Sequence, residues 1–282
     1  MSDESIVDLV KKHQAQAGTT PDKPMSGGVA QKAAVMSEAM PADRQSEEVL
    51  ERLLQNVTAK LTWMVVPLPS QGLLYPEGQK AVEIRPLTFD DERVLKSVTA
   101  TKNPEAVIEK LLRSCVRGID ASELTPADRL YVLFRIRGIS YGDKYPIEHE
   151  CTKCGASSKL DLSIESLETK NLTPEHMEFT LPDSEQDVII KLPRVQDAHL
   201  YDNLEAMHDN MPLFVYSVGG VTDKTIVEAF IRKTTVRDVD TLRTRIFDAD
   251  YGMENHFFYS CNSCGTRNRV GIDLNASFFT AS

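Results

Sequence analysis

The sequence contains two Cys-x-x-Cys-Gly segments, at 151–155 and 261–265. Each is preceded by a Tyr-Gly pair whose Gly lies nine positions before the first Cys. The five matching residues all recur at one offset of 110 positions, for example from Cys151 to Cys261. Self-similarity at a fixed offset indicates a repeated local structure.

Paired thiols at this spacing suit a metal ion. A Cys-x-x-Cys turn directs two thiolates at one centre, and the Gly that follows tolerates the positive φ that such a turn needs. Two turns supply four sulfurs, which is the tetrahedral set of a structural zinc site. We therefore predict a structural Zn²⁺ ligated by Cys151, Cys154, Cys261 and Cys264. Strand-like sequence flanks both pairs, so the module is expected to resemble a zinc ribbon.

Other uses of four cysteines remain open at this point. An iron–sulfur cluster needs the same four thiolates, although we favour zinc. Disulfides are disfavoured because the start of the chain lacks a secretory signal, and cytosolic thiols stay reduced. A thioredoxin-like redox motif would occur once, at a helix start, whereas here each pair is followed by strand-like sequence. His149 and His256 lie near the pairs, but with four Cys present we expect them to be neighbours rather than ligands.

The long separation of the two pairs is unusual for a zinc ribbon. Closing a loop of this length costs on the order of 4 kcal/mol. Structural zinc contributes about 10–16 kcal/mol in small peptides, so the metal outweighs the closure cost. A closed set of four thiolates leaves no position for water, so we expect the site to stabilise the fold rather than to catalyse.

Around this module the sequence predicts an α+β protein with a mostly helical body and a short β region, the zinc-ribbon-like module being split by a helical insert. Hydrophobic spacing and breaker residues give four parts. They are an extended or disordered arm (1–48), a body that begins with an amphipathic helix and a hairpin-like β region (49–140), the zinc module (141–165 with 250–276) and a mainly helical insert (166–249).

Three local features of the body bear on partners and on chemistry. Leucine and valine recur at helical spacing in SEEVLERLLQNVTAKL, which predicts an amphipathic helix. Leu73, Leu74 and Tyr75 lie in a loop rich in Pro and Gly, where packing on the core is favoured over a docking surface. Cys115 falls on the apolar stripe of a predicted helix and is expected to be a core residue.

Charge, apolar runs and the motifs that are missing from the sequence argue against several classes of function. The 282 residues carry a net charge of −10, which argues against a protein whose main task is to bind nucleic acid phosphates. No apolar run approaches the length of a membrane span, so no membrane partner is expected. We find no phosphate-binding glycine loop, nucleophile elbow or His-Glu-x-x-His motif in the sequence. The sequence therefore predicts a protein that is not an enzyme, with no catalytic residues.

Four segments, in order, carry a resemblance to a known family: PLPSQGLLYP, VEIRPLTFDDERVLKS, LLRSCVRGID and LTPADRLYVLFRIRGISYGDKYPIEHECTKCG. Their order resembles the baseplate hub proteins of T-even-like contractile-tailed bacteriophages, the "base plate protein" family. The resemblance runs from about Trp63 to Leu162 and resumes near Tyr251. It rests on a Pro-Ser-x-Gly loop at 69–72, on Arg-Pro-Leu-Thr at 85–88 before a helix, and on a helix that leads into the first Cys pair.

The resemblance implies a structural or assembly role in the central hub or inner baseplate, beneath the tail tube. Its partners would be other baseplate, hub and tail tube proteins. Its location would be the virion, after synthesis in the cytoplasm of the bacterial host. The arm at 1–48 is expected to become ordered on a partner. Two alternatives stay open: a hub-assembly chaperone absent from the mature virion, and a zinc-ribbon adaptor that binds nucleic acid through Lys153, Lys159, Arg267 and Arg269.

Overall fold

The computed structural model describes residues 42–96, 104–272, 274 and 276–279. The chain divides into two units, residues 1–54 and 55–282, and each is considered by itself. Most of the expected arm therefore lies outside the described residues. The boundary between the units falls within helix α2 (Ala42–Lys60), which begins upstream of the expected start of the body at residue 49. In the part of the chain that the structure covers, no helix has the length and apolar character needed to cross a bilayer.

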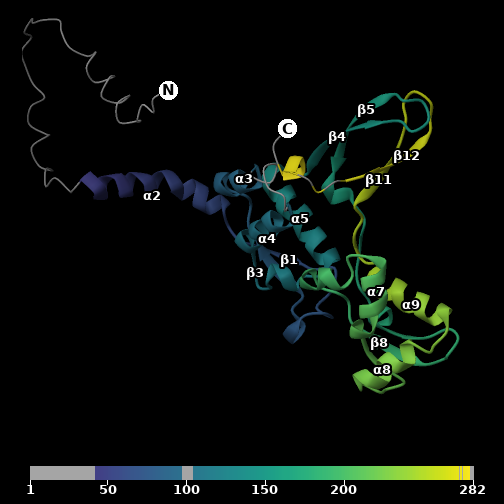
Figure 1. The fold of residues 1–282 in the computed structure, drawn as a ribbon. Helices are drawn as coiled ribbons and strands as arrows, with labels where there is room; N and C mark the ends of the chain where they lie inside the picture. The colour runs from purple at the N-terminus through teal and green to yellow at the C-terminus, as the bar shows by residue number, and fades with distance from the viewer. Residues whose placement is uncertain (1–41, 97–103, 273, 275, 280–282) are drawn as a thin grey trace, which may run out of the picture. The chain divides into compact units, whose positions relative to one another are not determined.

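The first part of the second unit combines a small sheet with helices. Strands β1 (Met64–Pro67), β2 (Ala81–Ile84) and β3 (Val116–Arg117) form an antiparallel sheet in that order. The helices are α3 (Phe89–Lys96), α4 (Pro104–Cys115) and α5 (Pro126–Tyr141). They enclose one hydrophobic core, which includes Cys115 as expected. Figure 1 shows α3, α4 and α5 grouped with this sheet.

The start of α3 is fixed by hydrogen bonds to one carboxylate. Asp91 accepts hydrogen bonds from the Thr88 backbone N–H at 2.8 Å and hydroxyl at 2.7 Å, which completes a capping box with Asp in place of Glu. It also accepts from Arg85 at 2.7 Å and from Ser114 at the end of α4 at 2.9 Å. Burial opposes ionisation of Asp91, but these donors outweigh it and hold its pKa below the usual range. One carboxylate thus joins α3 to α4.

A second sheet and its helices follow later in the chain. Strands β7 (Glu178–Thr180), β8 (Asp187–Ile190) and β9 (Val215–Val218) are antiparallel, again in chain order. The helices here are α6 (Pro174–Met177), α7 (Leu204–Asn210), α8 (Lys224–Ile231) and α9 (Val236–Phe247). They surround a second hydrophobic core. The expected helices of residues 166–249 are present, but this segment also contains the sheet, of which only β8 has a continuous apolar run in the sequence.

Two hairpins extend from these cores. Strands β4 (Lys144–Glu150) and β5 (Ser157–Ser163) form the first, and β11 (His256–Ser260) and β12 (Arg267–Gly271) form the second. A short pair, β6 (Thr169–Lys170) with β10 (Gly252–Met253), lies at the base of the second hairpin. Figure 1 shows the two hairpins side by side. The protein is therefore α+β, with helices and several small sheets.

The main elements before each hairpin come in one order, apart from α8 and β10, which have no counterpart among the described residues of the first repeat. In both cases a three-stranded meander is interrupted by helical segments between its second and third strands, and a longer helix then leads into the hairpin. We call residues 64–163 the first repeat and residues 178–271 the second repeat. The longer helices α5 and α9 begin at positions 126 and 236, so they keep the offset of the Cys pairs. The repeat therefore extends well beyond the cysteines, and the expected insert contains the first part of the second repeat.

Matching Thr and Asp residues begin the two longer helices. Thr125 and Thr235 are the N-caps, and each hydroxyl accepts the backbone N–H of an Asp three residues later. These carboxylates, Asp128 and Asp238, are both fully buried. Each accepts backbone N–H groups from the loop between the first two strands of its own repeat, Ser70 for Asp128 and residues 183 and 184 for Asp238. The same device thus fastens the meander to the helix in both repeats.

In the first repeat this device includes a tyrosine. The Tyr75 hydroxyl donates to Asp128 Oδ2 at 2.6 Å and accepts the Thr125 backbone N–H at 3.1 Å. Burial and the carboxylate of Asp128 raise the pKa of Tyr75, so the phenol remains a donor. Burial likewise raises the pKa of Asp128. Tyr75 packs inward, as favoured for this loop, and Leu74 packs against the core, whereas Leu73 is exposed.

We predict that Tyr75→Phe lowers the free energy of unfolding by about 1–3 kcal/mol, because it leaves a buried carboxylate oxygen and a buried N–H without their partner. Urea denaturation followed by circular dichroism measures this change. Tyr216→Phe is the matched control, since the Tyr216 side chain is 48% exposed and its loss of a hydroxyl is expected to change stability by no more than about 0.5 kcal/mol. Equal effects of the two substitutions would show that the Asp128 network does not stabilise the fold.

Candidate metal centre

Each Cys pair lies in the turn of one hairpin. The first turn connects β4 to β5, and the second connects β11 to β12. In the first, Cys151 N–H donates to the Ala156 carbonyl at 3.0 Å and Gly155 N–H to the Cys151 carbonyl at 2.9 Å. In the second, Cys261 and Gly265 make the same two bonds at 2.9 and 2.8 Å. The two turns therefore have the same backbone geometry.

The glycines are required by this geometry. Gly155 has φ of 71° and Gly265 has φ of 70°, a region that residues with a Cβ rarely adopt. The strand pairing also matches, because Glu150 opposes Ser157 in one hairpin and Ser260 opposes Arg267 in the other. The fixed offset seen in the sequence is thus a repeat of a complete hairpin, with the same register and the same turn.

The two turns bring all four predicted ligands together. The Sγ atoms of Cys151, Cys154, Cys261 and Cys264 all lie within 4.8 Å of one another. Across the hairpins, Cys151 Sγ is 3.6 Å from Cys264 Sγ, and Cys154 Sγ is 3.7 Å from Cys261 Sγ. Four sulfurs at about 2.3 Å from a central zinc would be about 3.8 Å apart. Both distances are far longer than an S–S bond, and all four thiols are free.

The electrostatics of the cluster favour a cation. Backbone N–H groups of Cys154 and Lys153 donate to Cys151 and lower its pKa to about 6, which favours its thiolate form. The Ala156 N–H acts in the same direction on Cys154, but neighbouring sulfurs and burial outweigh it and raise the pKa of Cys154 to about 12. Four sulfurs so close together cannot all ionise without compensation. A divalent ion supplies it, so the donor set fits Zn²⁺.

A buried amide links the two turns beside the sulfurs. Asn268 of β12 is buried, and its Oδ1 accepts both the backbone N–H and the hydroxyl of Thr152 at 3.0 Å. Its Nδ2 donates to the Thr266 carbonyl at 2.9 Å and lies 3.6 Å from Cys151 Sγ. Asn268 thus orients the first turn from the second hairpin. Asn268 is not among the residues predicted for the site, and its only signal in the sequence is that of a polar residue at an inward-facing strand position.

A second link joins the hairpins at matching positions. His149 Nδ1 lies 3.1 Å from the Tyr259 hydroxyl, and the two rings meet edge to face with centroids 5.6 Å apart. These residues occupy equivalent positions in β4 and β11. His256 instead contacts Glu254, with Nδ1 3.0 Å from a carboxylate oxygen. The structure therefore gives both histidines partners other than the sulfur cluster, as expected from four Cys.

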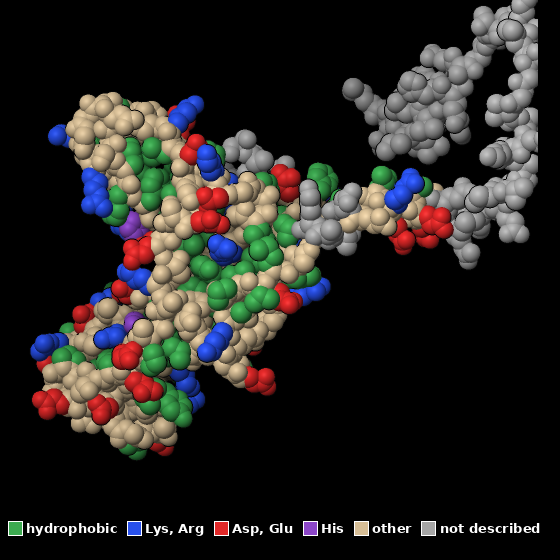
Figure 2. All heavy atoms as spheres, turned by 180° about the vertical axis from the view of Figure 1, so that it is seen from behind, with side chains coloured by type: hydrophobic (Ala, Val, Ile, Leu, Met, Phe, Trp, Pro, Cys, Tyr) green, Lys and Arg blue, Asp and Glu red, His purple; other side chains and the backbone are tan. Residues whose placement is uncertain are grey.

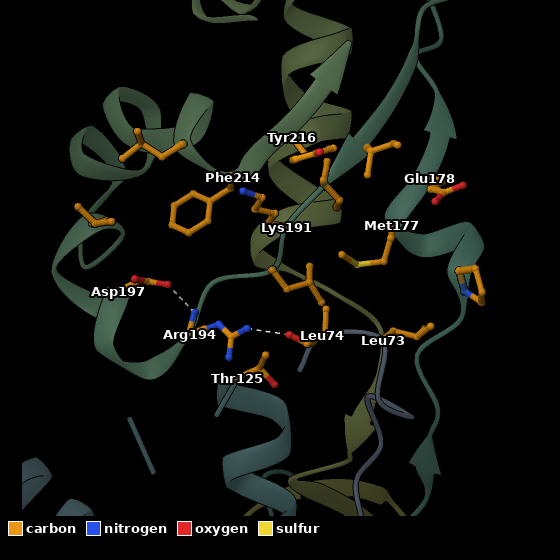
Figure 3. Close-up of a pocket in the computed structure, with 16 residues that line it drawn as sticks. Leu73, Leu74, Thr125, Met177, Glu178, Lys191, Arg194, Asp197, Phe214 and Tyr216 are labelled. Carbon is orange, nitrogen blue, oxygen red and sulfur yellow. Dashed lines mark hydrogen bonds between the residues drawn. The ribbon is translucent and has the colours of Figure 1, made fainter. Parts of the chain in front are cut away.

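A cavity lies elsewhere, between the 68–78 loop and the second repeat. It has a volume of about 630 Å³. Leu73, Met177 and Tyr216 are among its lining residues (Figure 3). The Arg194 guanidinium donates to the carbonyls of Leu74 at 2.7 Å and Glu123 at 2.8 Å. Arg194 thus connects the two repeats beside this cavity. That the chain is not an enzyme stays a prediction.

Comparison with known proteins bears on the same region. The family model described as "T4 bacteriophage base plate protein" matches residues 72–280, which include both repeats nearly in full and all four clustered cysteines. No curated protein and no solved structure matches the chain. The family match also covers residues 166–249, a segment that the resemblance seen in the sequence does not include. The chain belongs to the T4 bacteriophage base plate protein family.

Proposed function

We propose that the chain is a structural or assembly protein of the central hub or inner baseplate of a contractile phage tail, that it is not an enzyme, and that a structural Zn²⁺ stabilises its fold. The baseplate role is supported by the family match over most of the chain. The single observation that carries the metal is the convergence of four Sγ atoms within 4.8 Å from two separate hairpins.

Cys151, Cys154, Cys261 and Cys264 would hold the ion, and the two hairpins with their turns would form a zinc-ribbon-like module. When bound, zinc contributes folding free energy by joining four deprotonated sulfurs. The ion would be coordinated by two sulfurs from each repeat, so it would tie the repeats together at the ends of their hairpins. A closed four-sulfur set has no position for substrate or water, which supports a role without turnover.

The partners in this proposal are other baseplate and hub proteins and the tail tube, and the location is the virion tail. The hub placement rests on the resemblance described above. The arm at residues 1–48 is proposed to bind a neighbouring subunit and to become ordered there.

The contacts of Arg267 and Arg269 in the second hairpin argue against the alternative of a nucleic acid adaptor. The Arg267 guanidinium lies over the Phe258 ring at 4.2 Å, and Arg269 contacts His256 at 3.2 Å. Both therefore have partners on their own hairpin. On the face of the molecule in Figure 2, Lys and Arg side chains are interspersed with Asp and Glu rather than gathered. An unbroken basic surface, which phosphate binding favours, is not seen on that face.

We predict about one zinc ion per purified chain, measured by elemental analysis, and loss of that ion in Cys154→Ser. Chelation is expected to lower the melting temperature reversibly, because metal binding is coupled to folding. Cys115→Ala is the matched control and should keep its zinc, since Cys115 is buried in the first core, away from the cluster. Pure protein without metal would contradict the proposal, and iron with visible absorption would assign the sulfurs to an iron–sulfur cluster.

We predict that Asn268→Ala keeps one bound zinc but weakens zinc affinity by about 10–100-fold, the usual cost of losing a group that orients a ligand. Competition with a chromophoric chelator measures the affinity. Ser158→Ala is the control, because Ser158 occupies the equivalent position in the first hairpin, where it opposes His149 as Asn268 opposes Tyr259. Equal affinities for the two variants would mean that Asn268 does not orient the ligands.

We predict that mass spectrometry of purified phage particles detects the chain, in a copy number comparable to that of other baseplate proteins in the same particles. Detection in tail-assembly intermediates but not in finished particles would instead favour the assembly chaperone. Absence of the chain from both, in cells where it is expressed during infection, would contradict a baseplate role of either kind. Free proteins removed by the purification, such as host ribosomal proteins, provide the control for contamination.

A further inference from the structure

Helix α2 carries an apolar stripe that is exposed to solvent. Its members recur at intervals of three and four residues and therefore share one face of the helix. They are Val49, Leu50, Leu53, Leu54 and Val57, with exposures of 46, 55, 66, 42 and 47%. Scattered exposed apolar residues are ordinary, but a contiguous set of this size on one helix face marks an interaction surface.

The width of the stripe indicates what kind of surface covers it. At 100° per residue, the arc from Val49 to Leu54 spans about 140° of the helix circumference. The seam of a two-stranded coiled coil is narrower and uses only two positions in seven. A stripe this wide is buried when the helix lies in a groove between two other helices. The geometry therefore favours a groove over a single facing helix.

Charge indicates the chemistry of that groove. Glu47 and Glu51 are four residues apart and lie along one edge of the stripe, next to Leu54. Arg52 lies on the opposite side of the helix. A groove with Lys or Arg on the rim beside Glu47 and Glu51 would pair with this edge. A second copy of the chain would instead bring a second edge with Glu47 and Glu51, in a protein whose net charge is already −10.

The position of α2 in the chain points to a partner outside this fold. The helix precedes the first repeat, and the second repeat begins with no helix of this length. It also lies outside the residues that match the family, which begin at 72. The stripe is thus an addition to the duplicated body rather than part of the shared fold.

We infer that α2 docks its apolar stripe into a two-helix groove of another baseplate protein, one whose rim carries Lys or Arg beside Glu47 and Glu51. This inference rests on the proposed baseplate role and adds the chemistry of the partner.

The test is carried out with the full chain in infected cells. A photoreactive phenylalanine analogue at position 53 is expected to cross-link to an apolar helical segment, flanked by basic residues, of a different tail protein, identified by mass spectrometry of the joined peptides. Leu53→Glu is expected to reduce incorporation into particles by about tenfold or more, the factor that corresponds to losing one buried leucine from an interface. Gln55→Glu adds the same charge on the far side of the helix and should enter particles normally.

Cross-links from position 53 to a second copy, or to residues 61–279 of the same chain, would overturn the inference. So would equal incorporation of Leu53→Glu and Gln55→Glu. Both variants are expected to melt at the wild-type temperature, which excludes misfolding as the cause of any loss. If the wild-type chain is itself absent from particles and intermediates, the proposed baseplate role fails. If the wild-type chain is present and the two variants behave alike, only the docking inference fails.

Discussion

Four sulfur atoms within 4.8 Å of one another impose the strongest constraint in this protein. Each sulfur that ionises makes ionisation of its neighbours harder. The pKa of Cys151 is therefore lowered while that of Cys154 is raised, although the two residues share one turn. A divalent ion bound by all four sulfurs would remove this conflict. The hairpins, their glycine turns and the Asn268 amide together hold the sulfurs at spacings that a tetrahedral ion requires.

The second constraint is the buried carboxylate at the start of each longer helix. Asp128 and Asp238 lie at the positive end of a helix dipole, where a negative charge is stabilised. Each collects backbone N–H groups from the loop of its own meander, so helix and sheet are fixed to each other in the same way in both repeats. The hairpins project from α5 and α9, so these carboxylates help to set the direction in which the Cys turns point.

Much of the sulfur cluster could be predicted from the sequence, because Cys-x-x-Cys-Gly constrains the backbone and the positions of the thiols together. Asn268 and the His149–Tyr259 pair could not, since they act across hairpins whose contact exists only in the fold. The wider repeat was present in the sequence as Thr125-x-x-Asp128 and Thr235-x-x-Asp238, but two polar matches carry little weight without the structure. Strands β7 and β9, EFT and VYSV, were missed because they are short and contain polar residues, whereas β8 of similar length carries the continuous apolar run VII.

A cluster assembled from equivalent residues of two like halves has the arrangement expected on the axis of a symmetric dimer. In this chain the halves are covalently joined, so they meet at an effective concentration in the millimolar range however few copies the cell contains. Because both halves belong to one chain, their sequences can also differ, whereas the two subunits of a homodimer are identical. The two hairpins already differ at one such position, where the second has Asn268 and the first has Ser158. Each hairpin nevertheless still supplies two of the four sulfurs.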